Sequence, residues 1–311
     1  MEKATFLSAD HQTEITYHLW QPADDARAVL VLFHGMLEYG ERYAPFAEAL
    51  NARGIIVYAP DHLGHGDSVT GPDMRGHFAD RGGNACVLRD CYQMLTLAHA
   101  AHPDLPLFVM GHSMGSFLTR QLLHSYPLPA LAGVLLMGTG NQPRAAVAFG
   151  KLVTGTFARI FGPRHKSPLL FKLILGSNNL RFRPRKNDYD WLSRDEFSTD
   201  AFAHNPRIVD NFTCQAYADM LGGMLTNYDP ARLKMLDTTI PVFILSGAAD
   251  PIGGYGKGLE QLRDDYAALG YQDLTLRLYP DARHELLNEI NRDRVTADIV
   301  DWIEGRITTQ A

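Results

Sequence analysis

The most informative part of this sequence is residues 105–124, LPLFVMGHSMGSFLTRQLLH. It begins with an apolar run, 107–110, that is short enough to be a buried strand, and it ends with apolar residues at helical spacing. The pattern Gly-x-Ser-x-Gly between these parts predicts a sharp turn at Ser113. A strand, such a turn and a helix in succession are the context of a nucleophile elbow. Gly111 and Gly115 leave room where the strand and the helix pass each other.

The length and composition of the chain restrict its class. The 311 residues suffice for one large α/β domain with an insertion or for two modest domains, and the 46% hydrophobic and 21% charged fractions are ordinary for a soluble protein. The net charge of −6 argues against a nucleic-acid partner. The cysteines, Cys86, Cys91 and Cys214, are an odd number without metal-like clustering, which predicts reduced thiols. Residues 1–10 lack a signal-peptide core and no apolar run approaches membrane-spanning length, so we expect a cytoplasmic protein.

Buried strands and helices are predicted to alternate along most of the chain. Strands are expected at 5–7, 14–20, 27–33, 54–60, 107–110, 131–137, 241–246 and 274–279, and helices at 42–53, 84–101, 114–124, 258–268 and 292–306. The first two strands are expected to pair antiparallel at a sheet edge. The alternation of the others predicts a mostly parallel sheet with right-handed crossovers.

The alternation stops between residues 141 and 229, where helical pieces are separated by Gly and Pro and no buried strand is evident. Because strands resume afterwards, this segment is interpreted as an insertion into one domain. The predicted fold class is therefore α/β, with a mostly parallel central sheet and an inserted helical cap. The core is assigned to residues 1–140 and 230–311, and the cap to residues 141–229.

A serine nucleophile needs a base and an acid that orients the base. Asp250 follows the strand expected at 241–246, and His284 follows the strand expected at 274–279. In an open α/β sheet such loops lie together at the carboxyl ends of the strands. The order Ser113, Asp250, His284 along the chain is the order found in the α/β-hydrolase fold. These three residues are the predicted catalytic triad.

The tetrahedral oxyanion that a serine attack creates needs N–H donors that are already in place. One donor is expected to be the backbone N–H of Met114, directly after the nucleophile. The second is expected in the turn His34-Gly35-Met36, after the strand 27–33, with the Met36 N–H as donor. Because both donors belong to the backbone, the side chains at 36 and 114 could vary.

Together these motifs resemble the α/β-hydrolase superfamily, in the branch of monoacylglycerol lipases, bacterial lysophospholipases and serine aminopeptidase S33-type hydrolases. The matching stretches are 34–43 (HGMLEYGERY), 61–68 (DHLGHGDS), 111–115 (GHSMG), 247–251 (GAADP) and 283–285 (RHE), and cap residues 187–194 (NDYDWLSR) are similar to lysophospholipase-like members. The resemblance implies the same triad and oxyanion donors. It also implies that Glu38 and Arg42 lie near the pocket for the alcohol part of the substrate, and that no cofactor or metal is required.

The expected function is a serine hydrolase that cleaves carboxylic esters of lipids through an acyl-enzyme on Ser113, as a monoacylglycerol lipase or a lysophospholipase. Within the enzymes, the alternatives are a carboxylesterase for small substrates and an aminopeptidase or amidase, which would need an acidic subsite for a free amine. A ligand-binding protein on the same scaffold is the alternative from another class, since a fold alone does not define an activity. The sequence leaves the oligomeric state open.

Other polar residues have structural interpretations. His62, His65 and Asp67 are similar to a metal-ligand cluster, but we interpret them as a Gly-rich turn that caps neighbouring loops, because no further ligands accompany them. Asp90 is expected to be a structural hydrogen-bonding partner and Cys214 a packing residue in the cap. The His112 side chain is expected to point into the scaffold.

Residues 143–187 contain ten Lys or Arg residues and no Asp or Glu, together with apolar residues at helical spacing. Basic and apolar side chains together suit peripheral docking of the cap on the anionic inner membrane surface, or attraction of an anionic headgroup. The alternative is that the apolar faces cover the active site while the basic residues face water or pair with acidic core residues.

Overall fold

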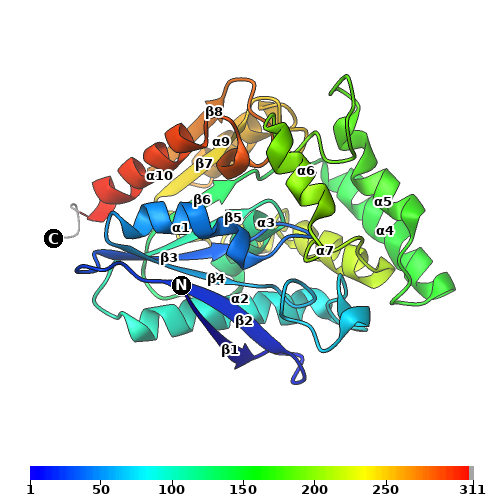
Figure 1. The fold of residues 1–311 in the computed structure, drawn as a ribbon, viewed down its shortest axis with the longest axis horizontal. Coiled ribbons are helices and arrows are strands. Elements are labelled where there is room, and N and C mark those ends of the chain that lie inside the picture. Colours follow the sequence, from blue (N-terminus) through cyan, green and yellow to red (C-terminus); the bar gives the residue numbers. More distant parts are fainter. Residues whose placement is uncertain (308–311) are drawn as a thin grey trace.

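The computed structural model describes residues 1–307 and is built around one eight-stranded sheet (Figure 1). The strands are β1 (Glu2–Leu7), β2 (Glu14–Trp20), β3 (Ala28–Phe33), β4 (Ile55–Pro60), β5 (Leu107–His112), β6 (Leu131–Met137), β7 (Val242–Gly247) and β8 (Leu274–Tyr279). Their order in the sheet is β1-β2-β4-β3-β5-β6-β7-β8. β1 pairs antiparallel with β2, and β2 with β4, whereas the remaining pairs are parallel. The predicted α/β class with a mostly parallel sheet is confirmed.

Helices cover both faces of the sheet because the central strands are apolar on both faces. Leu30 and Leu32 of β3 pack in one apolar cluster with α1 (Ala44–Asn51) and α10 (Arg292–Ile307). Val29 and Val31, which point the other way, pack in a second cluster with α2 (Gly83–Ala101), α3 (Met114–Ser125) and α9 (Lys257–Ala268). The sheet therefore forms the middle of three layers, and its loops are held at fixed positions.

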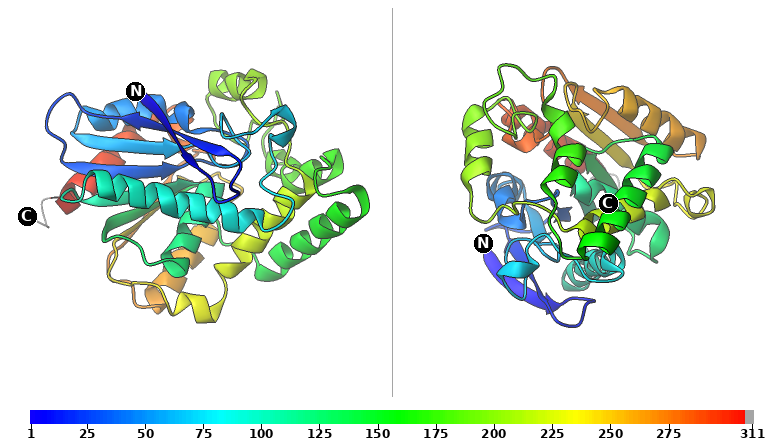
Figure 2. Two further views of the ribbon diagram at one scale, coloured as in Figure 1. Left: turned by 90° about the horizontal axis from the view of Figure 1, so that it is seen from below. Right: turned by 90° about the vertical axis from the view of Figure 1, so that its right-hand side faces the viewer.

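The segment between β6 and β7 lies across the carboxyl-terminal edge of the sheet (Figure 2). It contains α4 (Arg144–Phe161), α5 (Pro168–Ile174), the 3₁₀ helix η3 (Gly176–Asn179), α6 (Glu196–His204) and α7 (Cys214–Thr226). α4 packs along α7, and α7 packs on α2 and α3 of the core. β6 and β7 are neighbours in the sheet although this segment separates them in sequence, which is the arrangement of an insertion. We call residues 141–229 the cap.

A few short elements differ from the sequence-based expectation. The helix expected at 42–53 is a 3₁₀ turn, η1 (Gly40–Tyr43), followed by α1, which begins at Ala44 because Pro45 favours the first turn of an α-helix. The short elements η2 (Pro72–Met74), α8 (Pro230–Leu233) and η4 (Leu286–Asn288) were not predicted, since single turns leave little periodicity in a sequence.

The crossing of β5 and α3 depends on two glycines. A Cβ atom at Gly115 would lie 2.0 Å from the carbonyl oxygen of Phe33, and one at Gly111 would lie 2.3 Å from the carbonyl oxygen of Gly115. Both neighbours are backbone atoms, at the end of β3 and in the first turn of α3, and have little freedom to move. The glycines of the Gly-x-Ser-x-Gly pattern therefore allow α3 to start directly against β3.

Replacing Gly115 with alanine should destabilise the protein by about 2 to 4 kcal/mol, because the added methyl group overlaps the Phe33 carbonyl. Urea unfolding followed by circular dichroism measures this change. The matched control is Gly155→Ala in α4, where nothing lies within 4 Å of the new Cβ atom. That substitution should stabilise the protein by roughly 0.5 to 1 kcal/mol, because alanine is the better helix former. Equal effects at both positions would contradict the steric explanation.

Candidate active site

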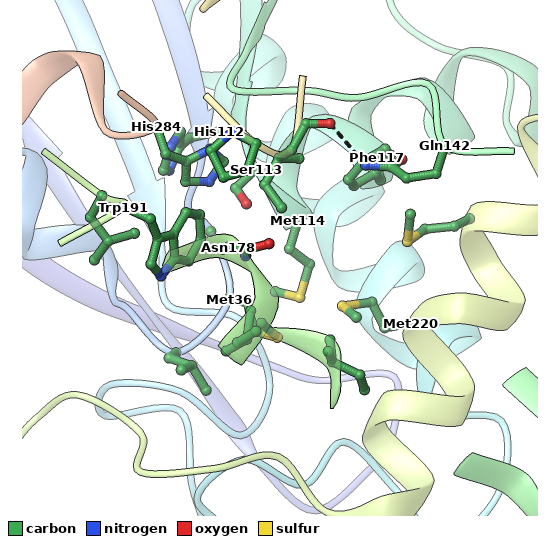
Figure 3. A pocket seen from close by; sticks show the side chains of 18 of the residues that line it. Met36, His112, Ser113, Met114, Phe117, Gln142, Asn178, Trp191, Met220 and His284 are labelled. Carbon is green, nitrogen blue, oxygen red and sulfur yellow. Dashed lines mark hydrogen bonds between the residues drawn. The ribbon is translucent and has the colours of Figure 1, made fainter. Parts of the chain in front are cut away.

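Ser113 occupies a strained turn between β5 and α3. Its φ of 50° and ψ of −116° are rarely adopted by a residue with a side chain. The surrounding hydrogen bonds hold this conformation: the Ser113 N–H donates to the Met137 carbonyl at 2.9 Å, and the Ser113 carbonyl accepts from the Ser116 hydroxyl at 2.6 Å. The side chain is thereby directed away from the sheet and into a cavity beneath the cap (Figure 3).

Asp250 and His284 lie next to each other although 34 residues separate them. His284 Nδ1 lies 2.9 Å from Asp250 Oδ2. Because a carboxylate only accepts hydrogen bonds, Nδ1 is the protonated ring nitrogen and its N–H donates a hydrogen bond to Asp250. Asp250 is fully buried, and it also accepts hydrogen bonds from the Ser246 hydroxyl at 2.7 Å and the Ile252 N–H at 2.8 Å. These bonds fix both the carboxylate and the tautomer of His284, which leaves Nε2 able to accept a proton.

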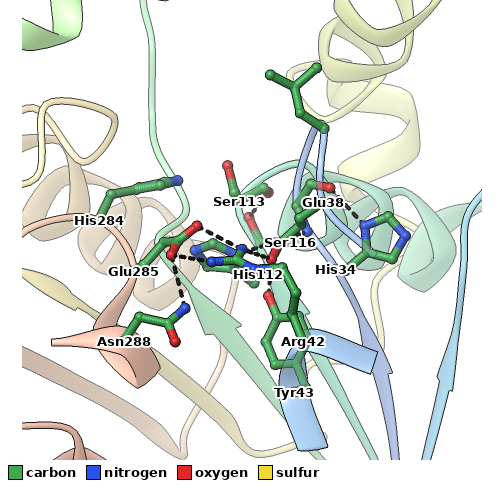
Figure 4. A network of polar contacts seen from close by, with 12 residues as sticks. His34, Glu38, Arg42, Tyr43, His112, Ser113, Ser116, His284, Glu285 and Asn288 are labelled. Carbon is green, nitrogen blue, oxygen red and sulfur yellow. Dashed lines mark hydrogen bonds and ion pairs between the residues drawn. The ribbon is translucent and has the colours of Figure 1, made fainter. Parts of the chain in front are cut away.

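Ser113 and His284 line the same cavity, and in Figure 4 the imidazole of His284 points toward Ser113. The hydrogen bonds within residues 1–307 do not include one between the Ser113 hydroxyl and His284. Such bonds are often long in ligand-free sites and shorten when substrate is bound. The structure therefore brings the three predicted triad residues to one site, with the bond between Asp250 and His284 formed.

The loop that carries His284 is held by the cap. The Trp191 ring packs on the imidazole with 4.8 Å between ring centroids, and the Glu285 N–H donates to the Leu192 carbonyl at 2.7 Å. Arg283 donates to the backbone carbonyls of Asp190 and Ser193. The cap segment 190–193 is thus part of the support of the imidazole, a role that sequence analysis did not assign to it.

The turn His34-Gly35-Met36, which is predicted to carry the second oxyanion donor, has a defined peptide orientation. His34 Nδ1 donates to the Gly35 carbonyl at 2.7 Å, while His34 Nε2 accepts from the His62 N–H at 2.9 Å. In a trans peptide the Met36 N–H points opposite to the Gly35 carbonyl, and therefore away from the His34 ring. Gly35 is also close to Ser113, because a Cβ atom at Gly35 would lie 3.1 Å from the Ser113 Cβ. Met36 and Met114 both line the cavity.

His34, His62 and His65 form a cluster of tilted and edge-on rings behind this loop, with 4.2 Å between the first two ring centroids and 5.1 Å between His34 and His65. Burial, the largest cause, lowers the pKa of His34 to about 3 and that of His65 to about 4, and it lowers the pKa of His62 well below 6.5. Neutral rings can both donate and accept, as when His65 Nε2 accepts from the Leu37 N–H at 3.3 Å. The cluster is a scaffold for the loop.

Glu38 and Arg42 belong to a buried network of charges beside the triad (Figure 4). Glu38 accepts from the Gly35 N–H at 2.6 Å and from His112 Nδ1 at 2.8 Å, and it pairs with Arg42 at 2.6 Å. Arg42 also forms a two-pronged pair with Glu285 at 3.0 and 2.9 Å. Glu38 and Glu285 line the cavity, whereas Arg42 lies behind them.

The charges of this network stabilise one another. Burial opposes the ionisation of Glu38, but Arg42 and His112 together hold its pKa well below the usual range. Burial also opposes a charge on His112, yet the hydrogen bond and the charge of Glu38 raise its pKa above 6.5. The His112 side chain is buried, as expected, but it also lines the cavity, and its ring packs 4.9 Å from the His284 ring.

The cavity has a volume of about 370 Å³ and is mostly apolar. The cap, α3 and the turn after β7 supply its walls, which include Phe117, Val147, Ile174, Met220, Met224 and Ile252. Polar side chains are gathered near Ser113, where Glu38, His112, His284 and Glu285 lie. The site therefore joins a charged end, where an ester bond can be held, to a long apolar space.

The other residues singled out in the sequence have structural contacts. Asp90 accepts from the Ser8 hydroxyl and the Ala9 N–H, both at 2.7 Å, and Cys214 is fully buried in the cap. Asp67 donates its N–H to Asp61. Within residues 1–307 no cluster of His, Cys, Asp and Glu side chains has the geometry of a metal site. In the same residues no helix combines the length and apolar character needed to span a bilayer.

The sheet has eight strands and is mostly parallel. A strained serine follows β5, an acid follows β7 and a histidine follows β8. This fold and this order of residues define an α/β-hydrolase. Residues 24–291 match the family described as serine aminopeptidase, S33. The chain belongs to this family, and the resemblance inferred from the sequence motifs is confirmed.

Known relatives are similar over almost the whole chain. A monoacylglycerol lipase of Mycolicibacterium smegmatis is 30% identical over 297 residues, 94% of each chain. The human monoglyceride lipase is 26% identical over 295 residues, which cover 93% of this chain and 86% of the human one.

Solved structures agree in fold. A thermostable carboxyl esterase from Bacillus coagulans, in complex with glycerol, gives a TM-score of 0.90 at 24% identity over 98% of both chains. A monoglyceride lipase variant from Saccharomyces cerevisiae, in complex with a substrate analog, gives 0.77 at 18% identity over 98% of this chain and 94% of the other.

The histidine cluster should make the protein less stable in acid. Between pH 6.5 and about 4, the unfolded chain takes up protons that buried His34, His62 and His65 do not take up in the folded state. Stability is therefore complete above pH 6.5 and falls as the pH is lowered, by roughly 1.4 kcal/mol per pH unit for each such histidine. Urea unfolding across this pH range measures the slope.

His65→Gln should reduce this slope, whereas His204→Gln, at a strongly exposed position, should leave it unchanged. Burial raises the pKa values of Asp90 and Asp219 to about 6, so these two carboxyl groups oppose the loss of stability as the pH falls. Their contribution is the same in all the variants. A His65→Gln variant with the slope of the wild type would show that the cluster does not resist protonation.

Proposed function

We propose that this protein hydrolyses the ester bond of monoacylglycerols through an acyl-enzyme on Ser113. The observation that carries the proposal is the Asp250–His284 pair at the rim of an apolar cavity into which Ser113 points. Membership of a hydrolase family and similarity to lipases and esterases support the cleavage of carboxylic esters.

In the proposed first step, the Ser113 oxygen attacks the ester carbonyl carbon while His284 Nε2 takes its proton. Asp250 holds the imidazole and stabilises its positive charge through the Nδ1 bond of 2.9 Å. The Met36 and Met114 N–H groups stabilise the tetrahedral oxyanion. His284 then gives the proton to the leaving alcohol, and the acyl group stays on Ser113.

In the second step, His284 removes a proton from a water molecule that attacks the acyl-enzyme, and the same N–H groups stabilise the new oxyanion. Collapse of this intermediate releases the fatty acid and returns the proton to Ser113. In both steps the groups that attack, transfer protons or stabilise the oxyanion, apart from the water molecule, are residues of this chain.

The choice of substrate rests on the shape and polarity of the cavity. Its apolar walls between α3, α4 and α7 suit an acyl chain, and its charged end suits an alcohol with hydroxyl groups. A monoacylglycerol lipase and a human monoglyceride lipase among the relatives, and the bound glycerol of the carboxyl esterase structure, support this assignment. An aminopeptidase would need a free carboxylate for the amine, but Glu38 and Glu285 are both paired with Arg42.

Ser113→Ala should abolish hydrolysis and labelling by a fluorophosphonate, because the variant lacks the hydroxyl that attacks the ester carbonyl or the phosphorus atom. Asp250→Asn should lower kcat by about 10⁴-fold, since the amide no longer holds the required tautomer of His284. The measurement is a panel of a monoacylglycerol, lysophosphatidylcholine, p-nitrophenyl esters of increasing chain length and an aminoacyl anilide.

The activities toward these substrates distinguish the alternative functions. Preference for lysophosphatidylcholine or for the anilide would replace the proposed substrate by a lysophospholipid or a peptide-like amide. A folded wild type that reacts with neither the fluorophosphonate nor any ester would instead indicate a ligand-binding protein. Surviving activity in Ser113→Ala would contradict the acyl-enzyme.

We also propose that the cap docks this enzyme on anionic lipid surfaces. Eight of the thirteen strongly exposed large apolar side chains in residues 1–307 belong to the cap: Phe149, Leu152, Ile160, Phe161, Leu169, Leu173, Leu180 and Phe197. Most of them lie on α4 and α5, at the end of the molecule away from α10 (Figure 2). An apolar face of this kind is typical of a protein that binds at a membrane interface.

Some basic residues of the cap are paired with carboxylates and others are not. Arg164 pairs with Asp80 of the core, as in the alternative considered from sequence, whereas Lys166, Arg185 and Lys186 pair with carboxylates of the cap, so part of the positive charge is neutralised. Arg144, Arg159, Lys172 and Arg183 are exposed, and the ion pairs described for residues 1–307 do not include them. Their charge is available to anionic headgroups next to the exposed apolar side chains.

Vesicle flotation tests this docking. The wild type should float with phosphatidylcholine vesicles that contain phosphatidylglycerol, and less so at high salt. Replacing Phe149 and Leu152 together by serine should weaken binding roughly 100-fold, because two large apolar side chains no longer enter the lipid. Met235→Ser, at an exposed apolar position outside the cap, is the control and should leave binding unchanged. Absence of wild-type flotation at any salt concentration would exclude the docking.

A further inference from the structure

The cap contributes a polar side chain to the catalytic cavity at Asn178 of η3 (Figure 3). This residue is only 7% exposed, and its carboxamide points into the cavity toward the side that carries Ser113. Its Nδ2 is buried and has no hydrogen-bond partner, and the side-chain hydrogen bonds of residues 1–307 do not include its carboxamide. A buried amide without a partner is uncommon, and in a cavity it marks a place that a ligand can complete.

The local sequence explains why this carboxamide faces the cavity. In a 3₁₀ helix, side chains three residues apart lie on the same side. The Asn178 N–H donates to the Leu175 carbonyl at 3.0 Å, and both side chains line the cavity. The neighbouring Asn179 faces the protein, where it donates to the Asn187 carbonyl and accepts from the Trp191 N–H, both at 2.8 Å. The two asparagines thus have different surroundings.

Other polar side chains of the cavity are anchored to the protein. Gln142 donates to the Ile252 carbonyl at 3.0 Å, which fixes its amide although its Oε1 has no partner within residues 1–307. His112 and Glu38 bond to each other at 2.8 Å, and Glu285 pairs with Arg42. Asn178 differs because no hydrogen bond within residues 1–307 fixes its side-chain amide. Its NH₂ donor and its carbonyl acceptor are therefore both available to a ligand in the cavity.

We propose that Asn178 determines alcohol specificity by hydrogen bonding to a free hydroxyl of the glycerol group of the substrate. This inference rests on the proposed function. In the proposed mechanism the ester carbonyl oxygen is taken by the Met36 and Met114 N–H groups, and the acyl chain has no polar atom. The polar groups left for Asn178 are therefore the hydroxyls of the alcohol, and a carboxamide can both donate to and accept from a hydroxyl.

The consequence is discrimination between esters that differ only in these hydroxyls. A site that hydrogen bonds a substrate hydroxyl disfavours the analogue without it, because its own buried polar group is then left unpaired. The test compares monododecanoylglycerol with propyl dodecanoate, which has the same acyl chain and a three-carbon alcohol without free hydroxyls. Both are presented in the same mixed micelles, and kcat/KM is measured for each.

Asn178→Leu keeps the approximate volume of the side chain and removes the amide. The expected result is a fall of about tenfold in kcat/KM for the glycerol ester, with a change of less than about twofold for the propyl ester. The control is Leu175→Ala, one 3₁₀ turn away on the same wall, which should change both values by a common factor because the acyl chain is the same. Thermal unfolding and fluorophosphonate labelling verify that each variant is folded, and Asn178→Ala serves as a second variant.

The possible outcomes are distinct. An equal fall for both esters, or no fall for either, overturns the role of Asn178 in alcohol specificity. A wild type that hydrolyses the propyl ester but not the glycerol ester overturns both the role of Asn178 and the proposed monoacylglycerol substrate, while leaving an esterase. A wild type that hydrolyses neither ester overturns both this inference and the proposed function.

Discussion

The strained backbone at Ser113 is the constraint around which the site is built. A φ of 50° at a residue with a side chain persists only where the neighbouring structure holds it, and here β6, α3 and the end of β3 do so. The Met137 carbonyl holds the Ser113 N–H, and Gly115 allows α3 to begin against the Phe33 carbonyl. Because the sheet supports both contacts, the position of Ser113 depends on the packing of the whole core.

The cap takes part in this support and also covers the site. Trp191 packs on the imidazole of His284, Arg283 donates to the cap backbone, and the Val209 N–H donates to the Leu37 carbonyl at 2.8 Å. The cap thus contacts both the loop of His284 and the loop that follows β3. A displacement of the cap would therefore alter the wall of the cavity and both of these loops together.

Much of this arrangement could be predicted from sequence because it follows local rules. Buried strands are continuous apolar runs, so β3, β5 and β7 were located to within a residue or two, and the residues that follow them were expected at one edge of the sheet. Ser113, Asp250 and His284 were selected on that basis. The structural role of Asp90 was also expected, and its partners, Ser8 and Ala9, became evident only in the structure.

The sequence by itself determined the α/β sheet, the inserted cap and the types of residue that end each strand, because hydrophobic periodicity and turn chemistry act over a few neighbouring residues. Only the tertiary structure decided which side chains pair. Arg42 lies between Glu38 and Glu285, and the amide of Asn178 is left open beside Asn179, whose amide is bonded. These contacts join segments that are distant in the chain, and the distances and burial that set their strength exist only after the core and the cap have packed together.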